Sequence, residues 1–171
     1  MFNQKILEVA SKYIGQKELK NNSGFVDKEF EEKIKKMGWM KGQAWCMYFV
    51  KLCIYEAALE LYGEKIATEK VKGLGGHVLT NWQILGKKYN KDFSPKAGEI
   101  GFMRKPGTTQ GHVFIVKSID NLGVRTIEGN TNSVGGREGD GVYEKYRKNA
   151  SMMNDSNPLK LLGYINLEEP L

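Results

Sequence analysis

A cysteine stands where a strongly apolar helix is expected to begin. In GQAWCMYFVKLCIYEA, residues 42–57, Cys46 precedes a stripe of apolar residues at helical spacing. The N–H groups and dipole of a helix N-terminus favour a thiolate, so Cys46 has the position of a nucleophile. Free cysteine is also among the most buried residue types, and this segment alone favours a core filler. Cys53, in the middle of the same stripe, is expected to be packing.

A thiolate nucleophile needs a base or an imidazolium partner, and the chain offers two histidines. His77 follows two glycines at an expected turn. His112 opens the expected strand HVFIV directly after the GTTQG turn, which makes it the better catalytic candidate. Taken alone, His112 fits a strand-initial surface residue equally well.

Two polar residues end a later strand and could orient an imidazole. The segment TIEGNTN, residues 126–132, presents Glu128 and Asn130 on either side of Gly129, which permits a sharp backbone path. Each side chain could accept the second N–H of a histidine. Singly, each is more readily explained as an ordinary turn residue.

The segments that must position these groups divide into helices first and strands second. Apolar spacing predicts three helices and a shorter fourth, at residues 3–14, 25–37, 44–62 and 78–89. Short β-branched and aromatic runs predict strands at residues 99–103, 112–119, 123–129 and 161–167. This order predicts an α+β fold, with N-terminal helices packed on an antiparallel β-sheet. Residues 149–158 are expected to form a mobile loop.

The size and composition of the chain set broad limits on its class. With 171 residues, 40% of them hydrophobic, residues 1–171 are expected to be a single domain and a monomer. No apolar run is long enough to span a membrane, and the start has no signal-peptide pattern. We therefore expect synthesis in the cytoplasm without a cleaved signal, and no membrane partner. The two cysteines are expected to be free thiols.

The formal charge of +6 favours polyanionic surroundings such as nucleic acid, anionic lipid or an acidic cell-wall polymer. The sign of the charge does not choose among them. The lysines are dispersed, without an Arg-rich helix, zinc-finger spacing or RNA-binding aromatic signature. We expect no nucleic-acid partner.

Together, AWCMYFV, GEIGFMRKPGTTQGHVFIV and TIEGNTN resemble the cysteine, histidine-dependent amidohydrolase/peptidase (CHAP) domain. That family has a papain-like fold and cleaves bacterial peptidoglycan. Its members place a Cys at the start of a central helix, then a Gly-Asp-Ile-like strand, a Gly-His-Val strand and a strand ending in Glu-x-Asn. The resemblance covers about residues 3–167 and implies that Cys46, His112, Glu128 and Asn130 are catalytic. It reverses the preference for a core role of Cys46.

The chain also departs from the family pattern. Glu99 and Gly101 stand where relatives often show a hydrophobic residue and Asp, and Phe114 stands where Gly is common. Phe114 is expected to narrow the site beside His112. Some relatives carry an Asp-rich calcium loop before the cysteine, whereas WMKGQAW has no carboxylate. We therefore expect no metal and no cofactor.

The resemblance implies hydrolysis of an amide bond through an acyl-enzyme on Cys46, with His112 as acid and base. The Cys46 N–H and Gln43 are expected to stabilise the oxyanion. Trp45 and Trp82 are candidates for substrate binding, although aromatic residues at helical spacing are more often core.

The implied partner is bacterial peptidoglycan, cut as a stem or cross-bridge endopeptidase or as an N-acetylmuramoyl-L-alanine amidase. We expect a phage or prophage endolysin, or a secreted antibacterial effector that travels with an immunity protein, acting on the wall after release or export. Two alternatives stay open: a non-catalytic wall-binding module, and a papain-like protein deamidase or transglutaminase.

Overall fold

The computed structural model describes residues 1–131, 139–154 and 156–168. The helices are α1 (Phe2–Lys12), the short 3-10 helix η1 (Lys20–Asn22), α2 (Lys28–Lys36), α3 (Cys46–Tyr62), α4 (Glu64–Val71), α5 (Val78–Lys88) and α6 (Asn149–Met153). The strands are β1 (Asn90–Asp92), β2 (Ile100–Arg104), β3 (Gly111–Ile119), β4 (Gly123–Thr131), β5 (Gly141–Lys148) and β6 (Lys160–Asn166). All six strands form one antiparallel sheet in the order β1-β6-β2-β3-β4-β5.

The predicted α+β class is confirmed, with helices preceding most of the sheet. The four predicted helices and four predicted strands are present with ends shifted by a few residues, whereas α4, β1 and β5 were not predicted. The prediction of a mobile loop over residues 149–158 is wrong at its start, because residues 149–153 form α6. The side chain of Met152 fixes this short helix, being almost fully buried against the sheet.

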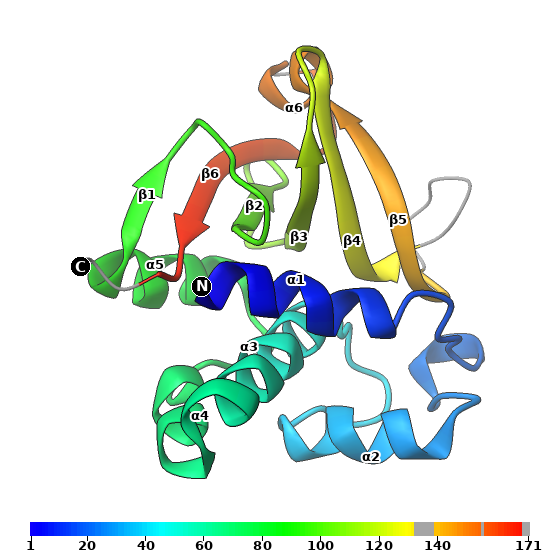
Figure 1. Cartoon of the computed structure of the whole chain (residues 1–171). Helices are drawn as coiled ribbons and strands as arrows, with labels where there is room; N and C mark the ends of the chain where they lie inside the picture. The colour runs from blue at the N-terminus through cyan, green and yellow to red at the C-terminus, as the bar shows by residue number, and fades with distance from the viewer. Residues whose placement is uncertain (132–138, 155, 169–171) are drawn as a thin grey trace.

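The sheet has a layer of helices on one face and a smaller apolar cluster on the other. Helices α1, α3 and α5 contact the central strands, and α1 runs across one end of the sheet (Figure 1). The opposite face carries a second cluster that α6 covers, formed by Met103, Phe114, Val116, Val124, Met152, Leu161 and Tyr164. Strand alternation places His112 and Phe114 on this same side of β3, and Thr126 and Glu128 on this side of β4.

The start of α2 is set by a side-chain cap. The carboxylate of Asp27 accepts the N–H groups of Glu29 and Phe30, so the helix begins at Lys28 rather than at residue 25. Phe25 is left outside the helix and packs edge-on against Trp45, the residue before α3. The aromatic contact joins this loop to the beginning of the central helix.

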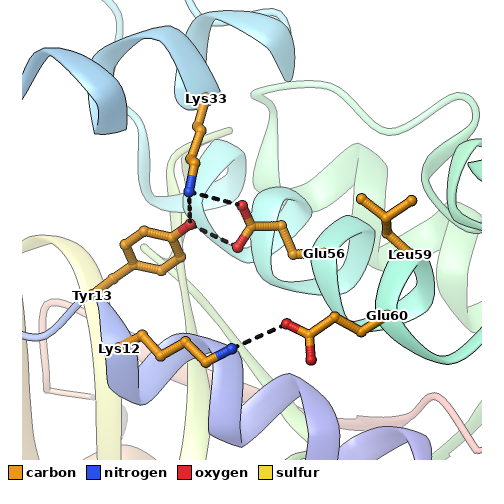
Figure 2. A pocket seen from close by; sticks show the side chains of 6 residues that line it. All are labelled: Lys12, Tyr13, Lys33, Glu56, Leu59 and Glu60. Carbon is orange, nitrogen blue, oxygen red and sulfur yellow. Dashed lines mark hydrogen bonds and ion pairs between the residues drawn. The ribbon is translucent and has the colours of Figure 1, made fainter.

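A polar cluster joins the C-terminal end of α1 to α2 and α3. Figure 2 shows the Tyr13 hydroxyl between Glu56 and Lys33, at 2.6 Å from Glu56 Oε2 and 3.2 Å from Lys33 Nζ. Burial and the hydrogen bond to Glu56 raise the pKa of Tyr13 well above its usual value, so the phenol remains a donor. Lys12 forms an ion pair with Glu60 one turn further along α3. These contacts fix the direction of the helix that carries Cys46.

Two departures from the family pattern, Gly101 and Phe114, fit each other in space. They are direct partners in the β2–β3 pairing. A Cβ on Gly101 would lie 2.2 Å from Cε2 of the Phe114 ring, so the ring occupies the space that a side chain at residue 101 would need. Phe114 is fully buried. The ring therefore lies over Gly101, on the same side of β3 as His112, and the expectation that it narrows the site stays a prediction.

Replacing Gly101 by Ala should destabilise the protein through this contact. Gly101 has no left-handed backbone, so the cost comes from overpacking and should be about 1–3 kcal/mol in the free energy of unfolding. Chemical denaturation of Gly101→Ala, Phe114→Leu and the double variant measures it. The two changes should couple, with Phe114→Leu recovering part of the loss. Strictly additive losses would contradict the fit.

Candidate active site

Cys46 is the first residue of α3, which begins two residues later than the predicted helix of residues 44–62. Trp45 precedes it without a side-chain cap, and no hydrogen bond among the described residues uses the Cys46 N–H. The helix end lies close to β4, because a Cβ on Gly129 would be 2.7 Å from Phe49 Cβ and from the Trp45 ring. Cys46 keeps 5% of its surface exposed, whereas Cys53 has none. Both thiols are free.

His112 bridges Cys46 and Glu128. Its Nε2 lies 2.8 Å from Glu128 Oε2. Because a carboxylate accepts, Nε2–H is the donor, which leaves Nδ1 for a second partner. The Cys46 side chain is close enough to His112 to raise the pKa of the imidazole. The structure thus brings three of the four predicted catalytic side chains together: the Cys46 thiol, the His112 imidazole and the Glu128 carboxylate.

The electrostatic surroundings of His112, between Cys46 and Glu128, favour a charged imidazole. Burial lowers the pKa of His112, but the hydrogen bonds with Cys46 and Glu128 outweigh it and raise the pKa to about 9. Burial likewise acts to raise the pKa of Glu128, yet the hydrogen bond and charge of His112, together with the charge of Arg147, hold it well below its usual value. Glu128 is therefore an anion inside the protein.

Two residues that were not predicted complete the surroundings of Glu128. Arg147 donates from Nε to Oε1 and from a terminal nitrogen to Oε2, both at 2.6 Å. The hydroxyl of Thr126 donates to Oε1 at 2.5 Å. Glu128 itself has no exposed surface. Arg147 stands in KYRKN, among the dispersed positive charges of the chain. In the β4–β5 pairing it lies opposite Val124 and reaches Glu128 diagonally, so no local sequence signal marks the contact.

Asn130 takes a different place from the other three. It has a left-handed backbone, φ +54°, next to the irregular pairing between β4 and β5 at Glu128 and Thr131. Asn tolerates this conformation better than most residues. Among the described residues its side chain has no hydrogen bond to His112, whose Nε2 is taken by Glu128.

Gln43 lies in the turn before α3 with its amide orientation fixed. Its Oε1 accepts from the Met40 N–H at 3.1 Å and from the Tyr48 hydroxyl at 3.2 Å. Its backbone oxygen accepts from the Trp39 indole. Because the side-chain oxygen is occupied, the Nε2 group is left as a donor, with no acceptor for it among the described residues.

The remaining candidates have mainly structural surroundings. Trp45 is completely buried among Phe25, Phe30 and Phe49, so the prediction that it binds substrate is corrected: direct contact requires exposed surface. Trp82 is half-buried against Phe102, and the structure shows no contact from it to Cys46 or His112 among the described residues. His77 caps α5 by accepting the Thr80 N–H.

The described residues include neither a cluster suited to a metal ion nor a helix suited to cross a membrane. They contain no group of three or more His, Cys, Asp or Glu side chains that could hold a metal ion. Within the same part of the chain, no helix combines the length and apolar character that crossing a membrane requires.

Comparison with known proteins gives one family. A family model described as the CHAP domain matches residues 38–130, slightly more than half of the 171-residue chain. The matched segment contains Cys46, His112, Glu128 and Asn130, whereas Arg147 lies beyond it. No curated protein matches the chain.

The charge state of His112 can be measured directly. The imidazole signals in NMR should titrate with a midpoint near pH 9, and Glu128→Gln should lower that midpoint because it removes the anion. The stability that charged His112 contributes should be complete below about pH 6.5, its unfolded pKa, and should be lost as pH rises through about 9. His112→Asn assigns the signal. A midpoint that Glu128→Gln leaves unchanged would contradict the arrangement.

Proposed function

Because the chain belongs to the CHAP domain family, in general a family of peptidoglycan hydrolases and amidases, we propose that Cys46 is the nucleophile of an amide-cleaving cell-wall enzyme. His112 is its acid and base, and Glu128 orients His112. Residues 1–171 act as a single catalytic domain. The observation that supports this proposal most directly is the proximity of the His112 imidazole to both the Cys46 thiol and the buried Glu128 carboxylate.

The first half of the reaction forms an acyl-enzyme. The Cys46 thiolate attacks the carbonyl carbon of the scissile amide, and the carbonyl oxygen becomes an oxyanion. His112, charged and held by Glu128, gives the proton on Nδ1 to the leaving nitrogen as the C–N bond breaks. The amine departs, and the acyl group remains on sulfur as a thioester.

The second half releases the product. Neutral His112 takes a proton from water through Nδ1, and the hydroxide attacks the thioester carbon. The collapse expels the Cys46 thiolate beside a charged imidazole, which restores the starting state. We assign stabilisation of the oxyanion in both halves to the Cys46 N–H and the Gln43 Nε2 group, because neither donor has an acceptor among the described residues. Asn130 contributes secondary polarity at the edge of the site.

The substrate is the anionic peptidoglycan of bacteria, which suits a chain of net charge +6. The bond is a stem-peptide or cross-bridge amide, or the amide that joins the lactyl group of the sugar to the first alanine. We place the protein as a phage or prophage endolysin or as a secreted antibacterial effector, which acts on the wall after release or export. An effector would be paired with an immunity protein.

Digestion of purified peptidoglycan tests the nucleophile. Wild type and Cys53→Ser should reduce the turbidity of at least one cross-link type, whereas Cys46→Ser should lose essentially all activity because the hydroxyl is a far poorer nucleophile at this position. Mass spectrometry of the new termini identifies the bond that is cut.

The same preparations separate the alternatives. Folded wild type that leaves every wall intact would overturn the proposal. Sedimentation with the wall without cleavage would then indicate a binding module, and ammonia release from protein glutamine would indicate a deamidase.

The oxyanion donor can be tested at Gln43. Gln43→Ala should lower kcat roughly a hundredfold with little change in KM, because the donor acts on the transition state. Tyr48→Phe is the matched control, since it removes one contact to the Gln43 oxygen but keeps the amide donor. Equal losses in both variants would assign Gln43 to loop structure instead.

A further inference from the structure

Arg147 holds the carboxylate on which His112 depends, although it lies outside the segment that matches the family. It comes from the edge strand β5, while Glu128 is on β4 and His112 on β3. Its guanidinium contacts both carboxylate oxygens at 2.6 Å, a two-point geometry that a lysine cannot reproduce. Its side chain is 19% exposed, so the pair is largely shielded from solvent.

The contacts divide between the two oxygens in a way that fixes the carboxylate plane. Oε1 accepts from Arg147 Nε and from the Thr126 hydroxyl, and Oε2 accepts from Arg147 and from His112. A carboxylate held only by the imidazole could rotate about its last bond, because that torsion is broad. With Oε1 anchored on the far side, Oε2 has one position to offer to Nε2.

The guanidinium of Arg147 is itself supported by an aromatic ring. Its guanidinium lies over the Phe114 ring, 5.5 Å from the ring centroid. Phe114 can occupy that place because Gly101 leaves room for the ring on β2. Gly101 and Phe114, which both depart from the family pattern, therefore support the guanidinium of Arg147 together.

We propose that Arg147, supported by the Phe114 ring and by Gly101, is a positioning residue that sets the orientation of Glu128 and so of the His112 imidazole against Cys46. Thr126 is the second fixed donor of the same device. The inference rests on the proposed function for its catalytic meaning, but the positioning of His112 against the thiol is a property of the folded protein.

The reaction of Cys46 with iodoacetamide reports on this positioning without requiring a substrate. The rate is measured from pH 5 to 9 in folded Arg147→Gln, Arg147→Lys, Thr126→Val and wild type, with the alkylated peptide identified by mass spectrometry. Arg125→Gln is the matched control, because Arg125 lies on β4, also packs over an aromatic ring, and has no contact with Glu128. Circular dichroism and thermal melting check the fold of each variant.

A misplaced imidazole stabilises the thiolate less well. Arg147→Gln should therefore lower the Cys46 alkylation rate at pH 6 about tenfold, and kcat on soluble peptidoglycan fragments by up to roughly a hundredfold with KM unchanged. Arg147→Lys should recover part of the loss, Thr126→Val should lose less, and Arg125→Gln should match wild type.

The outcomes separate the two proposals. Wild-type alkylation profiles and kcat in folded Arg147→Gln would overturn the positioning role, and if that variant does not fold, wild-type behaviour in both Arg147→Lys and Thr126→Val would do so. An altered profile in Arg147→Gln, together with a wild type that cleaves no wall, would uphold the positioning role and overturn the proposed function.

Discussion

The buried charge of Glu128 is the constraint around which this structure is organised. Removing an ionised carboxylate from water costs several kcal/mol even after the protein relaxes. Here a bidentate arginine, an imidazole and a hydroxyl offset that cost, so both oxygens are satisfied. If any of these donors were lost, the buried carboxylate would be left with an unsatisfied oxygen. The site is therefore as rigid as the pairing of the strands that carry these groups.

The strands that hold Glu128 and His112 must also be held in a fixed position relative to the Cys46 thiol, which belongs to the layer of helices. Cys46 belongs to a helix that packs on the opposite face of the sheet from the second cluster. His112 and Glu128 lie on the side of the second cluster, so Cys46 can reach them only at the end of the sheet. Gly129 permits this meeting, because a side chain there would collide with Phe49 and Trp45. The buried Trp45 is thus not a wall of a substrate groove. Because Trp45 is fixed in the core, it determines where the first turn of α3 lies relative to β4.

The sequence predicts the candidate site residues whose positions depend on the start of a helix or strand. It does not predict those whose positions depend on how the strands pair. Cys46 and His112 follow from a helix start and a strand start, which neighbouring residues specify. Arg147 could not be predicted in this way, because GVYEKYRK has the charged, half-exposed alternation of an edge strand and no apolar run. Its approach to Glu128 depends on the register between β4 and β5, which is set by residues distant in the chain. The helix α4 was missed for a related reason, since Gly63 ends one helix and also starts the next.

The choice between Glu128 and Asn130 as the partner of His112 has a physical consequence for the proposed reaction. The Nε2–H of His112 can be given to one acceptor, and a carboxylate stabilises a charged imidazole more than a neutral amide does. A lone buried carboxylate would tend to take up a proton and lose this effect. Arg147 keeps it ionised while contacting the oxygens from sides that the imidazole does not use. Arg147 thus keeps Glu128 ionised and leaves room on Oε2 for the imidazole N–H. In this way a residue that contacts neither the thiol nor the substrate can affect the proposed chemistry.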